Sequence, residues 1–146
     1  MNKIFPNRYI IHVAEDLRLE SGDKMSIMGL SQKGIELIEH NDKFVIPSLA
    51  VYGLFYGVRG DFDGKITIES RDGEKVLEAP LPVTARDDDD DDSSESDIDP
   101  KHSKLLVAGK FMNVYFKTAA RCKVTISLDD QEYSDYFSLR KPKKID

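Results

Sequence analysis

The chain is poor in the residues from which most catalytic and metal sites are built. Its 146 residues include one cysteine, three histidines and no tryptophan. A lone cysteine cannot form an internal disulfide, which fits a reducing compartment, so we expect a cytoplasmic protein. An apolar run of about 18 residues is also missing, which excludes a membrane-spanning helix. Residues 1–20 lack the pattern of a secretion signal, and we expect no membrane partner.

Motifs that bind cofactors or metals are missing as well. The spacing of His12, His40 and His102 matches no zinc motif. Neither phosphate-binding glycine pattern occurs, and the G-x-S-x-G motif of many hydrolases is absent. We expect His12 to share a strand face with Ile10, and the other two histidines to lie in polar loops. We therefore assign no catalytic residue, no cofactor-binding residue and no metal ligand.

Two local segments suggest chemistry but have simpler interpretations. Cys122 lies between Arg121 and Lys123, and neighbouring cations lower the pKa of a thiol and make it reactive. We favour the alternative that Cys122 is a small strand residue without a chemical role. The segment DFDG, Asp61–Gly64, is similar to the start of a calcium loop, but a strand begins near Ile66 where further oxygen ligands are required. We predict a turn there.

Charge is unevenly distributed along the chain. The formal net charge is −6, yet residues 87–99 contain nine of the 27 acidic residues and no lysine or arginine. Without them, 18 acidic and 21 basic side chains remain. The protein is therefore a weakly basic body that carries one acidic segment, and part of the positive surplus lies in the basic C-terminal tail, residues 140–146.

The acidic segment, residues 86–103, is predicted to be a flexible loop between two strands. Six consecutive aspartates, Asp87–Asp92, repel one another and have poor strand propensity. A long loop costs little to close, because loop entropy grows only logarithmically with length. In an alternative interpretation the segment imitates a polyanion and occupies a basic site on a nucleic-acid-binding partner, which makes the protein an acidic inhibitor.

Alternation of apolar and polar residues with a period of two dominates the rest of the chain. The segment KITIES places Ile66 and Ile68 on one face, and KVTISL, residues 123–128, repeats the pattern. This pattern is typical of half-buried antiparallel strands, and turn residues such as Asp72-Gly73 separate the runs. We predict strands over residues 8–14, 16–20, 24–30, 44–47, 49–58, 64–70, 74–79, 104–108, 111–117, 121–128 and 132–139. Many short strands favour one domain, residues 1–146, folded as an antiparallel immunoglobulin-like β-sandwich.

Three stretches resemble a family of small, uncharacterised bacterial proteins. They are AEDLRLESGDKMSIMGLSQKG (residues 14–34), FVIPSLAVY (44–52) and the closing pair that begins GKFMNVYF (109–116). The resemblance spans most of the chain outside the acidic segment and consists of strand and turn patterns. It implies a compact immunoglobulin-like sandwich and carries over no functional residue.

Aromatic residues in the segment LAVYGLFYGVRG suggest nucleic-acid binding. Tyr52, Phe55 and Tyr56 lie near Arg59 and could stack on bases, as in proteins that bind single strands. Both faces of a central strand are often buried, however, and we favour that interpretation. Since the acidic segment also repels polyanions, we expect no nucleic-acid partner.

The sequence thus favours a non-catalytic interaction module. We expect an unknown protein partner, bound through a sheet edge, a sheet face or the acidic segment. One alternative is a small-ligand binder or enzyme whose site is assembled from loops and leaves no local motif. The acidic inhibitor described above is the other.

Overall fold

The protein is an all-β structure in the part of the chain that the computed structural model describes, residues 3–20, 24–28, 34–85 and 103–141. In these ranges it contains no helix, and so none that could cross a membrane. The strands are β1 (Arg8–Ala14), β2 (Asp16–Glu20), β3 (Lys24–Met28), β4 (Ile35–Glu36), β5 (Ile38–His40), β6 (Lys43–Tyr56), β7 (Gly60–Glu69), β8 (Lys75–Ala85), β9 (Lys104–Phe116), β10 (Arg121–Leu128) and β11 (Gln131–Arg140). The all-β prediction is confirmed.

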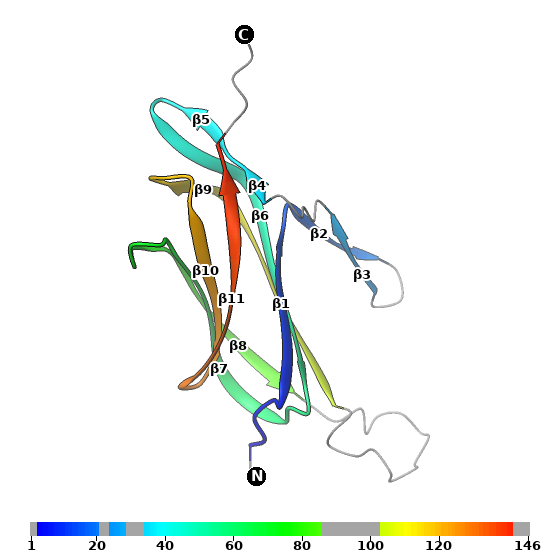
Figure 1. Cartoon of the computed structure of the whole chain (residues 1–146). Helices are drawn as coiled ribbons and strands as arrows, with labels where there is room; N and C mark the ends of the chain where they lie inside the picture. Colours follow the sequence, from blue (N-terminus) through cyan, green and yellow to red (C-terminus); the bar gives the residue numbers. More distant parts are fainter. Residues whose placement is uncertain (1–2, 21–23, 29–33, 86–102, 142–146) are drawn as a thin grey trace.

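The strands form two main sheets and one separate hairpin (Figure 1). In the first sheet the long strand β6 pairs with β1 and β5 along one edge and with β9 along the other. The second sheet has the order β4-β11-β10-β7-β8, and all its pairs are antiparallel except the short parallel pair of β4 and β11. Strands β2 and β3 pair with each other. We call the two main sheets the β6 sheet and the β10 sheet.

The two main sheets share one hydrophobic core. Alternate residues of β6, among them Leu49, Val51 and Phe55, are fully buried, and they belong to the same cluster as Ile66 and Ile126 of the β10 sheet. Apolar residues at every second position are what a strand needs to cover one face of a sheet. Burial of this apolar surface is the main stabilising contribution to the fold.

The inner faces approach closely where glycine replaces a side chain. A Cβ atom placed on Gly53 would lie 2.5 Å from Cδ1 of Ile126, in the other sheet. Beside it, the Phe55 ring packs edge-on against Tyr133 of β11, with ring centroids 5.3 Å apart. The Tyr9 hydroxyl donates a hydrogen bond to the Ser134 carbonyl at 3.1 Å and so links β1 of one sheet to β11 of the other.

Some observed strands are longer than the predicted ones, because they continue through positions where we expected a break. The predicted strands 44–47 and 49–58 are one strand, β6, that runs through Pro47. Pro47 lies between the stretch that pairs with β5 and the stretch that pairs with β1. Opposite it, Asn113 takes a positive φ of 54°, and this one pair is missing from a register of β6 and β9 that is the same on both sides. The missing N–H of proline is tolerated at such an irregularity.

The predicted turn at DFDG is wrong, because Asp61–Gly64 is part of β7. Phe62 is buried in the core, and its neighbours alternate with it. Gly64 serves a close approach of two backbones rather than a turn, since a Cβ atom there would lie 2.3 Å from the Leu81 carbonyl oxygen. Asp61–Gly64 is thus part of a strand with alternating buried and exposed residues.

Most of the acidic segment and of the basic tail lies outside the described residues. Two of their end residues are ordered parts of the fold. Ser103, the last residue of the predicted loop, is buried, and its hydroxyl donates a hydrogen bond to the Val58 carbonyl at 2.8 Å. Arg140, the first residue of the predicted tail, belongs to β11.

Candidate functional site

Cys122 is buried in the core of the protein. Its side chain is 1% exposed and belongs to the core cluster, while Arg121 on one side of it is exposed and Lys123 on the other is half-buried. Burial raises the pKa of the thiol to about 11. Strand alternation explains this, because successive side chains point to opposite faces and the two cations cannot reach the thiol. The favoured interpretation, a small strand residue without a chemical role, agrees with this burial.

The histidines do not gather into one site. His12 shares the outer face of the β6 sheet with Ile10, as predicted, and both side chains are exposed. Its ring lies 5.3 Å from the Tyr52 ring, measured between centroids. His40 is the last residue of β5, next to the turn at Asn41, and His102 lies outside the described residues. In the described part of the chain, no group of three potential ligands is arranged to hold a metal ion.

The aromatic segment of β6 is divided between the two faces of the sheet. Phe55 is fully buried, whereas Tyr52 and Tyr56 lie half-buried on the outer face. The prediction that both faces of this strand are buried is therefore wrong for the outer face. The strand is central in its sheet, but only the inner face is covered by the β10 sheet, so a central strand has one wet face.

The outer face of the β6 sheet carries a row of apolar side chains. Ile10 of β1 is paired with Leu54 of β6, which is paired in turn with Leu106 of β9. Ile10 is 41% exposed and Leu106 is 46% exposed. We call these three residues the apolar row. Side chains directly opposite on neighbouring strands lie about 5 Å apart, so the row forms a continuous strip across three strands.

A cationic group borders the apolar row on one side. In the adjacent row, Tyr56 is paired with Arg8 and with Lys104. The Arg8 guanidinium lies 4.1 Å and the Lys104 ammonium 5.7 Å from the centre of the Tyr56 ring, so both make cation–π contacts. Neither cation is paired with a carboxylate of the described residues. Within the described residues, two positive charges without a carboxylate partner therefore lie beside an exposed apolar strip.

The row on the other side contains two aromatic side chains, and an ion pair lies beyond it. It contains His12, Tyr52 and Ala108. Burial raises the pKa of the Tyr52 hydroxyl, so the ring is neutral at physiological pH. Further along β9, Lys110 is paired with Asp16 at 2.7 Å. On one side only, the apolar row is thus bordered by cations that have no carboxylate partner among the described residues.

A second candidate is a cleft at one end of the molecule, where three turns meet. Its volume is about 720 Å³. It is lined by residues of the turn between β5 and β6, of the turn between β7 and β8, and of the end of β9 with the residues after it. The wall includes an apolar part formed by Val76, Tyr115 and Phe116. Clefts of this size are typical of small-ligand sites.

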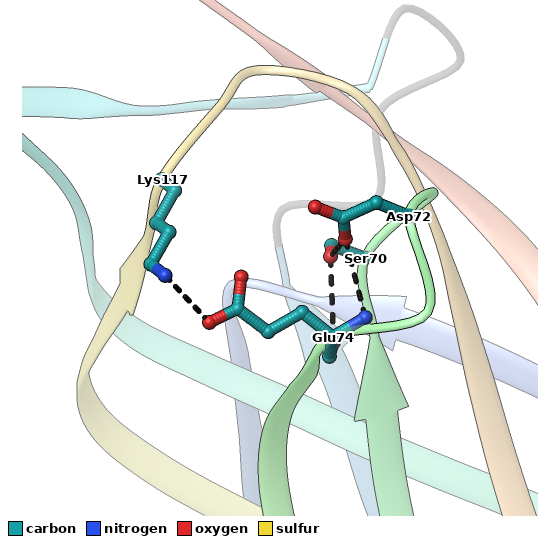
Figure 2. Close-up of polar contacts among 4 residues, drawn as sticks. All are labelled: Ser70, Asp72, Glu74 and Lys117. Atoms are coloured by element: carbon teal, nitrogen blue, oxygen red, sulfur yellow. Dashed lines mark hydrogen bonds and ion pairs between the residues drawn. The ribbon is translucent and has the colours of Figure 1, made fainter.

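The polar groups of this cleft bind one another (Figure 2). Lys117 forms an ion pair with Glu74 at 2.8 Å. The Ser70 hydroxyl donates a hydrogen bond to the Asp72 carboxylate, which also accepts one from the Glu74 N–H at 3.1 Å. The Ser70 bond holds the pKa of Asp72 below its usual value, and the bond to Glu74 raises the pKa of Lys117.

These contacts hold the turn between β7 and β8 in place, and they occupy the polar groups that could otherwise act on a ligand. Ser70 donates to a carboxylate that is held in its charged form, whereas a nucleophilic serine needs a general base that accepts its proton near neutral pH. His40 also lines the cleft, but within the described residues the Ser70 hydroxyl bonds to Asp72 and Glu74 and not to a histidine. The cleft therefore has the shape of a ligand site, and its polar groups in the described residues are engaged with one another.

The comparisons with known proteins add no relative. No family model, no curated protein and no solved structure matches this chain. What can be argued about function thus depends on the geometry described above. Sequence reasoning missed the apolar row, although its signal is present: the outward positions Ile10, Leu54 and Leu106 are apolar, where a wet strand face is normally polar.

Proposed function

We propose that the protein is a non-catalytic interaction module that binds a partner protein through the outer face of its β6 sheet. The apolar row and its cationic border carry this proposal. Scattered exposed apolar residues are ordinary, but a contiguous strip across three strands is typical of an interaction surface. The fold that presents it is, in this proposal, an immunoglobulin-like sandwich of the bacterial family that the sequence resembles, working in the cytoplasm.

The charges beside the row indicate the chemistry of the partner. Arg8 and Lys104 are held near Tyr56 and have no carboxylate partner among the described residues. A complementary surface places carboxylates opposite them and apolar side chains opposite Ile10 and Leu106. We therefore expect a protein segment that presents apolar residues next to aspartate or glutamate.

The aromatic rings of this face favour a protein over a nucleic acid. Base stacking requires an uncovered ring face. The Tyr56 ring already has Arg8 at 4.1 Å, and the Tyr52 ring has His12 at 5.3 Å. This agrees with the expectation that no nucleic acid is bound.

The test uses charge substitutions on the face and a matched control elsewhere. Partners are captured from the native host with the wild-type chain, with a double variant Ile10→Glu and Leu106→Glu, and with Ile38→Glu. Ile38 is a suitable control because it is also apolar and 51% exposed, but lies on β5, away from the row. A captured protein supports the proposal only if the purified pair binds directly, if Arg8→Glu weakens that binding, and if the control does not.

Two other results would contradict the proposal. Equal capture by the double variant and the wild type would show that the face is not used. Sedimentation of the wild type as a dimer, and of the double variant as a monomer, would assign the face to a second copy of this chain. Thermal melting of each variant checks that loss of binding is not loss of folding.

A small ligand in the cleft between the turns is the second candidate function. The volume of about 720 Å³ and the apolar wall at Val76 and Tyr115 favour it. A fragment screen followed by nuclear magnetic resonance should then show binding that perturbs the amides of Val76, Tyr115 and Lys117. Fragments that perturb other surfaces equally would count against this cleft.

A further inference from the structure

A second cleft lies on the other sheet and contains an excess of positive charge. It has a volume of about 650 Å³ and lies where β10 and β11 meet the turn between β7 and β8. Its lining includes three cations from two elements: Arg71 from the turn, and Arg121 and Lys123 from β10. We call it the cationic cleft.

None of the three cations is neutralised by an ion pair within the described residues. Arg121 makes a cation–π contact, with its guanidinium carbon 4.5 Å from the centre of the Tyr136 ring. The side chains of Arg71 and Lys123 make no ion pair or hydrogen bond with another described residue. Glu69 is the one carboxylate in the lining, and it faces Lys123 across the strand pair. The cleft thus keeps a surplus of two positive charges.

The arrangement favours a compact anion over a long one. The next rows along the same face are neutral or internally paired: Thr125 bonds to Ser134 at 2.9 Å, and Lys65 pairs with Glu78 at 3.0 Å. A polynucleotide requires a stripe of cations that follows its backbone. In this direction along the sheet, no unpaired cation of the described residues continues the cleft.

We propose that the cationic cleft binds the phosphoryl group of a phosphate monoester. Two guanidinium groups present paired N–H donors that match phosphate oxygens, and a surplus of two charges matches a dianion. The exposed Tyr136 ring, 53% accessible, borders the cleft and can contact the organic part of the ester. The ester is either a free small molecule or a phosphorylated side chain, because the recognised chemistry is the same.

Phenyl phosphate is the first probe, titrated into the full-length protein and followed by nuclear magnetic resonance. We expect shifts centred on the amides of residues 69–73, 121–123 and 136. Arg121→Gln should weaken binding about tenfold, since a charge-assisted bidentate contact is lost. Lys123→Gln, which leaves the Tyr136 contact intact, should weaken it in the same direction and guards against a folding effect of the first variant.

Arg8→Gln is the matched control. Arg8 also lies over a tyrosine ring, but on the other sheet. Affinity for phenyl phosphate should not change in this variant. If it falls as much as in Arg121→Gln, binding follows the overall charge and the site is rejected. Unchanged affinity in Arg121→Gln rejects it as well.

The dianion preference has its own test. The second pKa of a phosphate monoester is about 6, so affinity should rise between pH 5 and pH 7. Phenyl sulfate, which stays a monoanion, should bind more weakly at pH 7 and show no such rise. No histidine lines the cleft, where the titratable groups are Glu69, Lys123, Tyr136 and the two arginines. Equal affinity for both probes at pH 7 overturns the proposal.

Two further probes distinguish a free small phosphate ester from a phosphorylated polypeptide. Free phosphotyrosine that binds as tightly as a phosphotyrosine peptide supports a small molecule, and a tighter peptide supports a phosphorylated polypeptide; both outcomes retain the phosphoryl site. Tighter binding of a single-stranded oligonucleotide through Arg121 would overturn it. This site is separate from the face proposed for the partner protein, so either proposal can fail without the other.

Discussion

The outer faces of the two main sheets differ in how their polar groups are satisfied. On the β10 sheet, Glu78 pairs with Lys65 at 3.0 Å and with Lys75 at 2.8 Å, and Thr125 bonds to Ser134. On the β6 sheet, an apolar row lies beside Arg8 and Lys104, which have no carboxylate partner among the described residues. A face whose groups satisfy one another is stable in water by itself, apart from the cationic cleft at its end. Covering a face of exposed leucine and isoleucine is favourable, because it removes apolar surface from water.

The largest expected effect separates the inner and outer faces of one strand. Phe55→Ala should lower the free energy of unfolding by about 3–5 kcal/mol, because it leaves a cavity between the sheets. Leu54→Ala, one residue away on the outer face, should cost less than about 1.5 kcal/mol. Denaturant unfolding measures both. Similar losses at the two positions would mean that the apolar row is part of a buried interface rather than a solvent face.

The reactivity of Cys122 sharpens the same comparison on the β10 sheet. Its pKa of about 11 predicts that the folded protein reacts with a thiol reagent at pH 8 about 100-fold more slowly than the unfolded chain. The raised pKa also implies stability that is full below pH 9 and is lost as the pH rises through 11. Fast modification of the folded protein would show that the side chain faces Arg121 and Lys123 after all.

The hydroxyl pair on the β10 sheet should contribute measurably. Thr125→Val removes one partner of the Thr125–Ser134 bond, and we expect a loss of about 1 kcal/mol in unfolding free energy. Thr84→Val is the control, because Thr84 is exposed on β8 and its side chain makes no hydrogen bond with another described residue. Equal effects in the two variants would show that β propensity, not the hydrogen bond, decides the outcome.

Acid should weaken the polar face and leave the apolar row unaffected. Hydrogen bonds from Lys75 and then Lys65 hold the pKa of Glu78 below its usual value. This stabilisation is present above the unfolded pKa of about 4.3 and is lost as the pH falls below it. The melting temperature of Glu78→Gln should therefore be slightly lower than that of the wild type at pH 7, and the difference should vanish near pH 3. A difference independent of pH would exclude the ion pairs as its cause.

The smallest expected effect concerns the acidic segment. Deletion of residues 87–99 should leave the melting temperature nearly unchanged, since the described core is built from strands on both sides of it. If the segment is instead a decoy for a basic partner, the deletion and added salt should both abolish capture of that partner. A collapse in stability on deletion would contradict the prediction that the segment is only a connector.

Predicted and observed strands agree where alternation is strong. Residues 8–14, 16–20 and 121–128 are strands with the predicted bounds. Predictions fail at the gap expected between the strands 44–47 and 49–58, and at the turn expected over Asp61–Gly64. In both places a neighbouring strand decides the outcome: β9 pairs with β6 on both sides of Pro47, and β8 passes too close to Gly64 for a side chain.

By itself the sequence determined the fold class, the register of inward and outward residues within most strands, and the separation of one acidic segment from a weakly basic body. These properties are local, because alternation and charge are read along the chain. Only the tertiary structure decided which strand faces remain wet, and which residues distant in sequence become neighbours. Ile10, Leu54 and Leu106 form one strip, and Arg71 joins Arg121, because strand pairing brings them together. Pairing is a long-range choice, set by how two apolar faces cover each other, and no short stretch of sequence contains it.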